Sequence, residues 1–372
     1  MGCVLGQDGR SQSTQRREVA VGADQHKTRL TDIAQHAGLS TATVSRVING
    51  KPGVSSTARR QVLAALDVLG YNRPERSSQR RQGLIGLIIP ELTNPIFPAF
   101  AQAMEIELSH RGYTPLLCTQ SPGGTTESEY LDVLMDHKVD GIIIVSGLNA
   151  DSTASHQRYE ELRAQGVPLA FINGFVEGID ATFVSHDDVG SVALAVRHLV
   201  SLGHTRIGLA TGPRRFMPSQ RKIDGFHAAM AQYCPTHSGE SESDVALSLF
   251  TVEGGQAAAA GLIAQGCTGI ICASDLMAIG AIRAARAVGK QVPEQISVVG
   301  FDDAPFNSYL DPGLTTIRQA TSEMSHAVVS AILNEINGEP AARGEMLFQP
   351  ELIVRGSTGT APMSEELLGG RL

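Results

Sequence analysis

Hydrophobic positions follow two different patterns along the chain, and the pattern changes near residue 84. From there on, short and almost continuously apolar runs alternate with helix-length segments, many of which end at a glycine. Such runs are typical of strands that are buried on both faces of a parallel sheet. The predicted strands cover residues 84–89, 114–118, 141–146, 168–172, 182–185, 206–210, 269–272 and 296–301. We therefore expect a doubly wound α/β fold in two similar lobes, with a ligand cleft at the carboxyl ends of the strands.

Residues 28–70 show the spacing of three short helices instead. Their apolar faces consist of Ile33, Ala34 and Ala37, of Val44, Val47 and Ile48, and of Val62, Ala65, Leu66 and Leu69. Gly38 provides a tight turn between the first two helices, and Ser40 is placed to cap the second one. Ser55 is placed in the same way before the third helix, which stops at Gly70. This arrangement predicts a helix-turn-helix domain.

The face of the second helix opposite its apolar stripe carries small polar residues and one arginine. Arg46 can form two hydrogen bonds with guanine, while Thr41 and Ala42 can contact base edges and thymine methyl groups. The expected contacts to DNA phosphates are Ser40, Thr43, Ser45 and Asn49. A small helical bundle without a partner would also expose polar residues, so this alternative stays open.

The charge distribution favours DNA binding. Residues 1–83 contain 13 Lys and Arg but only 6 Asp and Glu. The remaining residues contain 17 Lys and Arg and 32 Asp and Glu. A basic segment on an acidic body is typical of a polyanion-binding module joined to one that does not bind polyanions. Charge alone would leave a merely solvated surface equally possible.

The composition, with 42% hydrophobic and 18% charged residues, is that of a folded globular protein. No apolar run approaches the ~20 residues that cross a bilayer, and residues 1–20 lack the apolar segment of a secretion signal. The five cysteines form no CxxC pair, which favours free thiols in a reducing cytoplasm over a metal site. We expect a cytoplasmic, nucleoid-associated protein with no membrane contact, no metal and no cofactor.

These patterns divide the chain into five segments. They are a disordered tail at 1–26, a helix-turn-helix domain at 27–70 (the head), a linker at 71–83, a two-lobed domain at 84–360 (the body) and a flexible C-terminus at 361–372. An overlong gene start is an equally open interpretation of the first segment.

Both domains contain short motifs that are typical of one known family. Those of the head are Asp32-Ile33-Ala34, Ala37-Gly38-Leu39-Ser40, Thr43-Val44-Ser45-Arg46-Val47-Ile48-Asn49 and Leu69-Gly70-Tyr71. Those of the body include Asn94-Pro95-Ile96-Phe97, Leu202-Gly203-His204-Thr205-Arg206-Ile207-Gly208 and Val299-Gly300-Phe301-Asp302-Asp303. On these motifs the chain resembles the lactose/galactose repressor (LacI/GalR) family. The resemblance implies an all-α helix-turn-helix head and a two-lobed α/β core like that of periplasmic sugar-binding proteins. It also implies a homodimer on a near-palindromic operator of double-stranded DNA, with Thr41, Ala42 and Arg46 as base readers.

The linker departs from the family pattern. The family usually has a hinge helix whose Leu wedges into the minor groove and kinks the DNA, and residues 71–83 contain no Leu. Arg76, Arg80 and Arg81 are therefore expected to contact phosphates or the minor groove in its place.

The resemblance also assigns an effector site in the body. Its residues are Asn94, Phe97, Ser146, Lys222, Phe250, Ser274 and Asp302. Lys222 stands where the family has a ligand-clamping Arg, Phe250 where a ring stacks on a sugar or base, and Asp302 where a carboxylate accepts hydroxyl hydrogen bonds. Structural roles remain open for three of them: Phe250 in the core, Asp302 as a helix cap and Asn94 in a turn. His186 and His204 are expected to be structural.

Catalytic motifs are missing: the sequence has no GxSxG, GxxxxGK[ST] or HExxH, and no GxGxxG after a predicted strand. We expect a transcription regulator rather than an enzyme, and a repressor rather than an activator. A small molecule in the cleft, most simply a sugar, would modulate its operator affinity. A solute-binding protein of the transport type would instead need an export signal and no basic head.

Overall fold

The structure, a computed structural model, describes residues 30–48, 53–69, 83–120, 123–235 and 244–362. It divides into two units, Met1–Gln79 with the head and Arg80–Leu372 with the body. Several predicted features lie outside the described residues. They are the tail at 1–26, Asn49, the linker with Arg76, Arg80 and Arg81, and most of the C-terminal segment.

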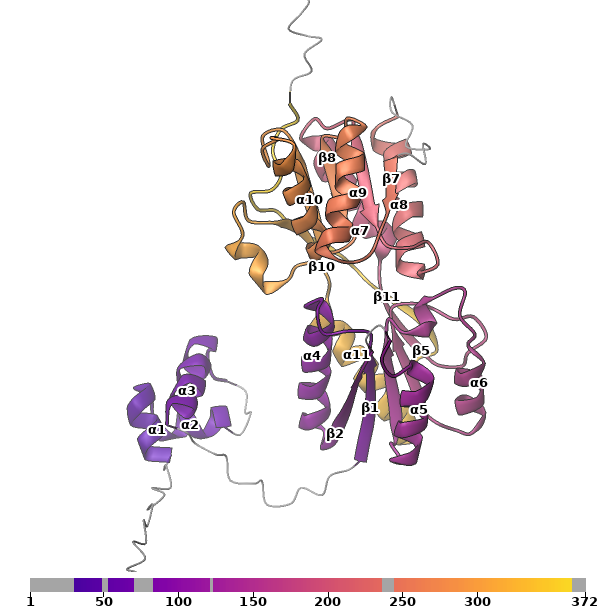
Figure 1. The fold of residues 1–372 in the computed structure, drawn as a ribbon. Coiled ribbons are helices and arrows are strands. Elements are labelled where there is room, and N and C mark those ends of the chain that lie inside the picture. Colours follow the sequence, from indigo (N-terminus) through magenta and orange to yellow (C-terminus); the bar gives the residue numbers. More distant parts are fainter. Residues whose placement is uncertain (1–29, 49–52, 70–82, 121–122, 236–243, 363–372) are drawn as a thin grey trace, which may run out of the picture. The chain divides into compact units, whose positions relative to one another are not determined.

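The head contains the three predicted helices, α1 (Leu30–Ala37), α2 (Thr41–Ile48) and α3 (Ser56–Val68) (Figure 1). Their buried residues form one small core of Ile33, Ala34, Val44, Val47, Val62 and Ala65. Gly38 adopts a φ of 64°, a left-handed conformation that glycine takes without strain, and it turns the chain between α1 and α2. Ser40 caps α2, because its Oγ accepts a hydrogen bond from the Thr43 N–H at 3.2 Å. The predicted turn and cap are thus confirmed.

The body contains two six-stranded sheets among its described residues. In spatial order, the first consists of β11 (Gly344–Phe348), β5 (Thr182–His186), β4 (Leu169–Ile172), β3 (Gly141–Val145), β1 (Gly83–Ile89) and β2 (Tyr113–Thr119). The second consists of β12 (Glu351–Ile353), β10 (Thr315–Arg318), β9 (Ser297–Asp302), β8 (Gly269–Cys272), β6 (Ile207–Thr211) and β7 (Val245–Leu247). All pairings are parallel except that of β10 with β12.

Helices cover both faces of each sheet, so the predicted doubly wound fold is confirmed (Figure 1). The first sheet lies between the pair α4 (Ile96–His110) and α11 (Thr321–Ile336) and the pair α5 (Glu127–Asp136) and α6 (Gln157–Ala164). The second lies between the pair α9 (Val252–Ala264) and α10 (Asp275–Ala287) and the pair α7 (Asp188–Ser201) and α8 (Met217–Tyr233). Two short 3-10 helices, η1 (Leu148–Ala150) and η3 (Pro305–Tyr309), complete the lobes.

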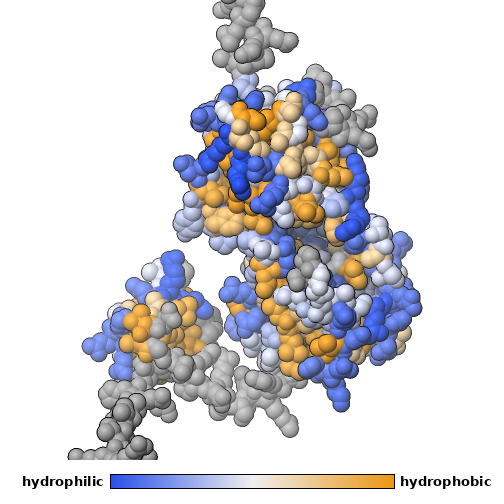
Figure 2. All heavy atoms as spheres, in the orientation of Figure 1, coloured by the Kyte–Doolittle hydropathy of each residue, from blue (hydrophilic) through white to orange (hydrophobic). Residues whose placement is uncertain are grey.

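Amphipathic spacing explains why these helices pack on the sheets. In α4, the buried residues Ile96, Phe100, Met104 and Leu108 recur every fourth position and form one face against the first sheet. The strands are buried on both sides, as in β3, where every residue is buried. Hydrophilic and hydrophobic residues are interspersed on the face of the body that Figure 2 shows, as is usual for a soluble domain surface.

The described chain passes between the two lobes at three places, after β5, after β10 and after β11. The first and third passages are tied together, because the Asp187 N–H donates to the Phe348 carbonyl at 2.9 Å. Crossing segments of this kind, implied by the resemblance, place the carboxyl ends of both sheets opposite each other. Any site between the lobes is therefore built from the loops that follow the strands.

Candidate functional site

The predicted DNA-reading face lies on α2. Thr41, Ala42 and Arg46 are exposed, while Thr43 and Ser45 are half-buried. Val44 and Val47 are buried on the opposite side of the helix, so the reading face points away from the core of the head. Ser40 is exposed but its hydroxyl is engaged, since it caps the helix and lies 2.9 Å from the Thr43 hydroxyl. The structure thus gives Ser40 a structural role beside the predicted phosphate contact.

The body contains a cavity of about 460 Å³ between its two lobes. All seven residues that the sequence assigned to an effector site line it: Asn94, Phe97, Ser146, Lys222, Phe250, Ser274 and Asp302. They come from both lobes: Ser146 directly follows β3 and Asp302 ends β9, while Phe97 lies in the first turn of α4 and Ser274 caps α10. Sequence reasoning missed other lining residues, among them Glu91, Asp151, Asn173, Arg215, Phe216 and Gln319. Most of these lie on loops whose course depends on the tertiary fold.

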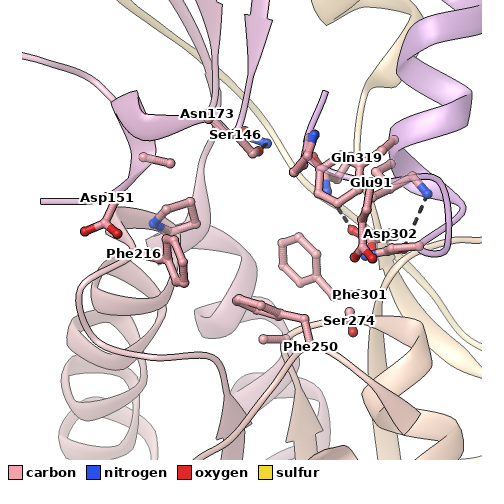
Figure 3. Close-up of a pocket in the computed structure, with 18 of the residues that line it drawn as sticks. Glu91, Ser146, Asp151, Asn173, Phe216, Phe250, Ser274, Phe301, Asp302 and Gln319 are labelled. Carbon is pink, nitrogen blue, oxygen red and sulfur yellow. Dashed lines mark hydrogen bonds between the residues drawn. The ribbon is translucent and has the colours of Figure 1, made fainter. Parts of the chain in front are cut away.

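Aromatic rings form much of the cavity wall. Figure 3 shows the rings of Phe216, Phe250 and Phe301 around the open space. The centroids of Phe216 and Phe250 are 6.2 Å apart, with the rings tilted by 55°. Gly212 lets the Phe250 ring approach the backbone closely, because a Cβ at residue 212 would lie 2.1 Å from the ring and would force it to move. Flat apolar rings of this kind suit the C–H faces of a small ring-shaped ligand.

Asp302 supplies a carboxylate at the end of β9. Its Oδ1 accepts a hydrogen bond from Gln319 Nε2 at 2.6 Å (Figure 3), and the Asn94 side chain also hydrogen-bonds to it. Burial, with the nearby charge of Asp275, raises the pKa of Asp302 well above its usual value, against the opposing effects of Gln319, Lys222 and Asn94. Asp302 has a φ of 110°, which is strained for a residue with a Cβ and which its surroundings must maintain.

Lys222 lies at the cavity wall, but its ammonium is already bound within the protein. It forms an ion pair with Asp188, the first residue of α7, and the side chains of both residues are only 7% exposed. Lys222 Nζ also lies 4.0 Å from the centroid of the Phe301 ring, at a distance typical of a cation–π contact. The neighbouring Arg221 forms two hydrogen bonds with Glu345, at 2.7 and 2.9 Å. The clamp position of the family is therefore occupied here by a lysine that ties α8 to α7.

Ser274 and the adjacent Asp275 carry structural contacts. Ser274 Oγ accepts a hydrogen bond from the Met277 N–H at 3.2 Å and caps α10. The Asp275 carboxylate accepts hydrogen bonds from the Ala304 N–H, Asn307 Nδ2 and Thr316 Oγ1, at 2.6–2.7 Å. Burial raises the pKa of Asp275 to about 6 despite these donors. These two residues hold the second lobe together behind the cavity wall.

Four residues close one side of the cavity by joining the lobes, and we call them the clasp: Asp151, Ser152, Arg215 and Phe216. Both the N–H and the hydroxyl of Ser152 donate to the Arg215 carbonyl at 2.8 Å. Arg215 Nε lies 3.1 Å from Asp151 Oδ2, and the Arg215 guanidinium lies 4.8 Å from the Phe216 ring centroid. The clasp connects the loop after η1 in the first lobe with the loop after β6 in the second.

A buried acid positions the lining loop at residues 147–150. The Glu127 carboxylate accepts hydrogen bonds from the Tyr159 hydroxyl and, at 2.9 Å, from the Leu148 N–H. The Asn149 side chain fixes the same loop through the carbonyls of Asn173 and Gly174, at 2.7 and 3.0 Å. Burial raises the pKa of Glu127. The first-lobe wall is therefore held in place by a polar network beneath it.

The two histidines are in structural positions, as expected. His186 lies at the end of β5 and hydrogen-bonds to Ser191, while His204 contacts Thr268 and Ser297, all at 2.7–2.9 Å. Among the described helices, none combines the length and the apolar character needed to cross a bilayer.

Comparisons with known proteins connect the two domains to one family. The family of bacterial regulatory proteins called the lacI family matches residues 29–74, and a periplasmic binding protein-like domain matches residues 196–358. The HTH-type transcriptional regulator MalR of Streptomyces coelicolor is 58% identical over 336 residues, which make up 90% of this chain and 98% of that protein.

Solved structures agree with this assignment. The transcriptional regulator CelR in complex with cellobiose is 27% identical, with a TM-score of 0.65 over 89% of this chain and 99% of that one. A lac repressor dimer bound to operator and an anti-inducer is 26% identical, with a TM-score of 0.64 over the same shares of the two chains. The chain therefore belongs to the LacI family of bacterial regulatory proteins: it is a DNA-binding transcriptional regulator with a periplasmic-binding-protein-like body, and not an enzyme.

Proposed function

We propose that this regulator is a homodimeric repressor whose affinity for a near-palindromic operator changes when a sugar binds in the interlobe cavity. The observation that best supports this proposal is that seven residues, up to about two hundred positions apart in sequence, line one cavity. Its volume of about 460 Å³ lies within the range of small-molecule sites. The cellobiose bound to CelR and the operator bound to the lac repressor dimer support the two halves of this proposal.

The cavity has the two chemical features that sugar recognition needs. Phe216, Phe250 and Phe301 offer apolar faces to the C–H groups of a pyranose or furanose ring. Asp302 offers carboxylate oxygens and Asn94 an amide, which can accept and donate hydrogen bonds to ring hydroxyls. In this proposal Phe97 and Ser146 complete the wall, and Lys222 and Ser274 act by holding α8 and α10.

A thermal-shift screen of neutral sugars on the full chain tests the effector half. A bound sugar stabilises the folded protein by an amount that grows with the logarithm of one plus its concentration over Kd, so a true effector raises Tm. Phe250→Ala and Asp302→Asn should abolish that shift, whereas Asp136→Asn, at an exposed position on α5, should keep it. A shift that survives in both cavity variants would place the sugar elsewhere.

Operator selection from random duplexes tests the DNA half. An inverted repeat is expected, and Arg46→Ala should weaken binding to it by about 1–3 kcal/mol and relax the preference at one base pair of each half-site. Arg60→Ala, an exposed arginine on α3, is the matched control for loss of one positive charge. Equal effects of the two variants, or no inverted repeat, would contradict the assigned reading face.

A further inference from the structure

The two cationic side chains among the described lining residues of the cavity are Lys222 and Arg215, and both are paired with carboxylates of the protein. We propose that the cavity therefore selects uncharged sugars and rejects their anionic counterparts, such as sugar phosphates and sugar acids. This inference rests on the proposed sugar response and specifies its ligand class.

Lys222 cannot serve an anionic ligand without losing its present contacts. Its ammonium lies between the Asp188 carboxylate and the Phe301 ring, 4.0 Å from the ring centroid. Both charged side chains are 7% exposed, so turning the ammonium toward a ligand would leave the buried Asp188 carboxylate without its ion-pair partner. The ion pair thus removes the cation that the position would otherwise offer.

Arg215 is engaged on two sides as well. Its Nε lies 3.1 Å from Asp151 Oδ2, and its guanidinium stacks over the Phe216 ring at 4.8 Å. Ser152 holds its carbonyl from the first lobe, so the residue is fixed by its backbone in the clasp. An anion that approached this arginine would have to share its positive charge with Asp151, which already lies 3.1 Å from Nε.

The remaining ionisable groups on the wall are acids. Glu91 and Asp302 both line the cavity, and Asp302 receives its hydrogen bonds from the uncharged amides of Gln319 and Asn94. An anionic ligand would lose its hydration next to these acidic groups without gaining a cation, which is unfavourable. The first turn of α8 can donate backbone N–H groups at the wall, but such donors serve a neutral hydroxyl oxygen as well as an anion.

Calorimetric titration of the full chain with matched sugar pairs tests the inference. Suitable pairs are cellobiose and cellobionate, maltose and maltobionate, glucose and glucose 6-phosphate, and ribose and ribose 5-phosphate. For each pair that binds, the neutral member should bind about tenfold or more tightly than the anionic one. Equal or tighter binding of an anionic member would overturn the inference while leaving the sugar response intact. If no member of any pair bound, the proposed sugar response would fail, and this inference with it.

One variant attributes the discrimination to the wall. Glu91→Gln should narrow the ratio of the two dissociation constants by about threefold or more, because it removes one negative charge near the ligand. Asp136→Asn, an exposed acid away from the cavity, should leave the ratio unchanged. Raising the salt concentration should strengthen binding of the anionic member alone, since salt screens repulsion between charges. A ratio of dissociation constants that does not respond to Glu91→Gln would refute the electrostatic cause.

Discussion

His186, at the end of β5, keeps one ring nitrogen without a hydrogen-bond partner among the described residues. Ser191 Oγ donates to the Asp187 carbonyl at 2.6 Å, so its single proton is used there. His186 Nε2 must then donate to Ser191 Oγ, at 2.7 Å, which leaves the neutral Nδ1 as a buried lone pair. Burial, with the nearby charge of Lys222, lowers the pKa of His186 to about 3.

This pKa makes the stability contribution of His186 dependent on pH. Below pH ~6.5 the unfolded chain binds a proton at this residue, whereas the folded protein does not until the pH approaches 3. The free energy of unfolding of the wild type should therefore fall, relative to His186→Asn, by up to about 1.4 kcal/mol per pH unit as the pH drops below ~6.5.

Urea unfolding of both proteins at several pH values between about 7.5 and about 5 measures that difference in the free energy of unfolding. Comparing the two proteins cancels the effects of buried acids such as Asp275, whose raised pKa acts in the opposite direction. His110→Asn, at an exposed position of α4, is the matched control. A wild type and a His186→Asn variant that respond identically to pH would show that the pKa of His186 is the same in the folded protein as in the unfolded chain.

At the scale of elements, the start of α2 combines a structural and a predicted functional role in one residue. Ser40 caps the helix through the Thr43 N–H, and it was also predicted to contact a phosphate. Ser40→Ala removes the cap and should destabilise the head by about 1 kcal/mol. Ser40→Asp keeps a capping oxygen and should retain stability, but its negative charge should weaken operator binding.

Thermal unfolding and operator titration of these two variants separate the roles. Ser55→Ala is the control, because Ser55 caps α3 in the same way, with its Oγ 3.2 Å from the Ala58 N–H. If Ser40→Asp bound operator as tightly as the wild type, Ser40 would lie too far from the phosphates to contact them.

The clasp is a second element whose role can be tested. Arg215→Ala removes its ion pair and ring contact but keeps the backbone hydrogen bonds of Ser152. Because the Arg215 side chain is 54% exposed, the loss of stability should stay below about 1 kcal/mol. The bound sugar should nevertheless dissociate about three- to tenfold faster, because fewer contacts must break for the cavity to open. The association rate should change little.

Stopped-flow measurement of sugar release checks this expectation. Arg158→Ala is a suitable control, because Arg158 forms exposed ion pairs with Asp132 and Glu161 away from the cavity. An unchanged dissociation rate in Arg215→Ala would mean that the clasp does not limit the exit of the ligand.

Strands with a clear run of apolar residues were predictable from the sequence, and strands without such a run were not. The eight predicted strands correspond to β1–β6, β8 and β9, and their buried apolar runs explain why they stood out. β7 and β12 have three residues each, and β10 reads Thr-Thr-Ile-Arg, so none of them forms a recognisable apolar run. β11 is partly exposed along its whole length at the edge of the first sheet, which weakens the apolar signal in the same way.

At the scale of the whole molecule, the same distinction separates the predictable part of the candidate site from the rest. Residues at the carboxyl ends of strands, such as Ser146 after β3 and Asp302 at the end of β9, converge because parallel strands bring these ends to one edge. The partner of Lys222 was not predictable, because Asp188 lies 34 positions away on another helix and only the packing of α7 on α8 joins them. The clasp escaped prediction for the same reason, since it depends on how two loops of different lobes meet.

Coupling between the head and the body must be reciprocal if the sugar controls operator binding. A sugar that changes operator affinity by some factor must have its own affinity changed by operator DNA by the same factor, because both paths lead to one ternary state. For a coupling free energy of about 1–3 kcal/mol, that factor is about 5–150. Calorimetric titration of an active sugar into the protein, with and without saturating operator duplex, should therefore give dissociation constants that differ by the factor found in operator titrations.

Asp302→Asn distinguishes coupling from a general loss of function. It should keep operator affinity, because the carboxylate lies in the body and α2 in the other unit, but it should no longer respond to the sugar. Arg46→Ala should show the converse, with normal sugar affinity and weak operator binding. If a sugar bound the cavity with the same affinity in the presence and absence of saturating operator, it could not regulate DNA binding at equilibrium, and the regulatory half of the proposed function would have to be abandoned.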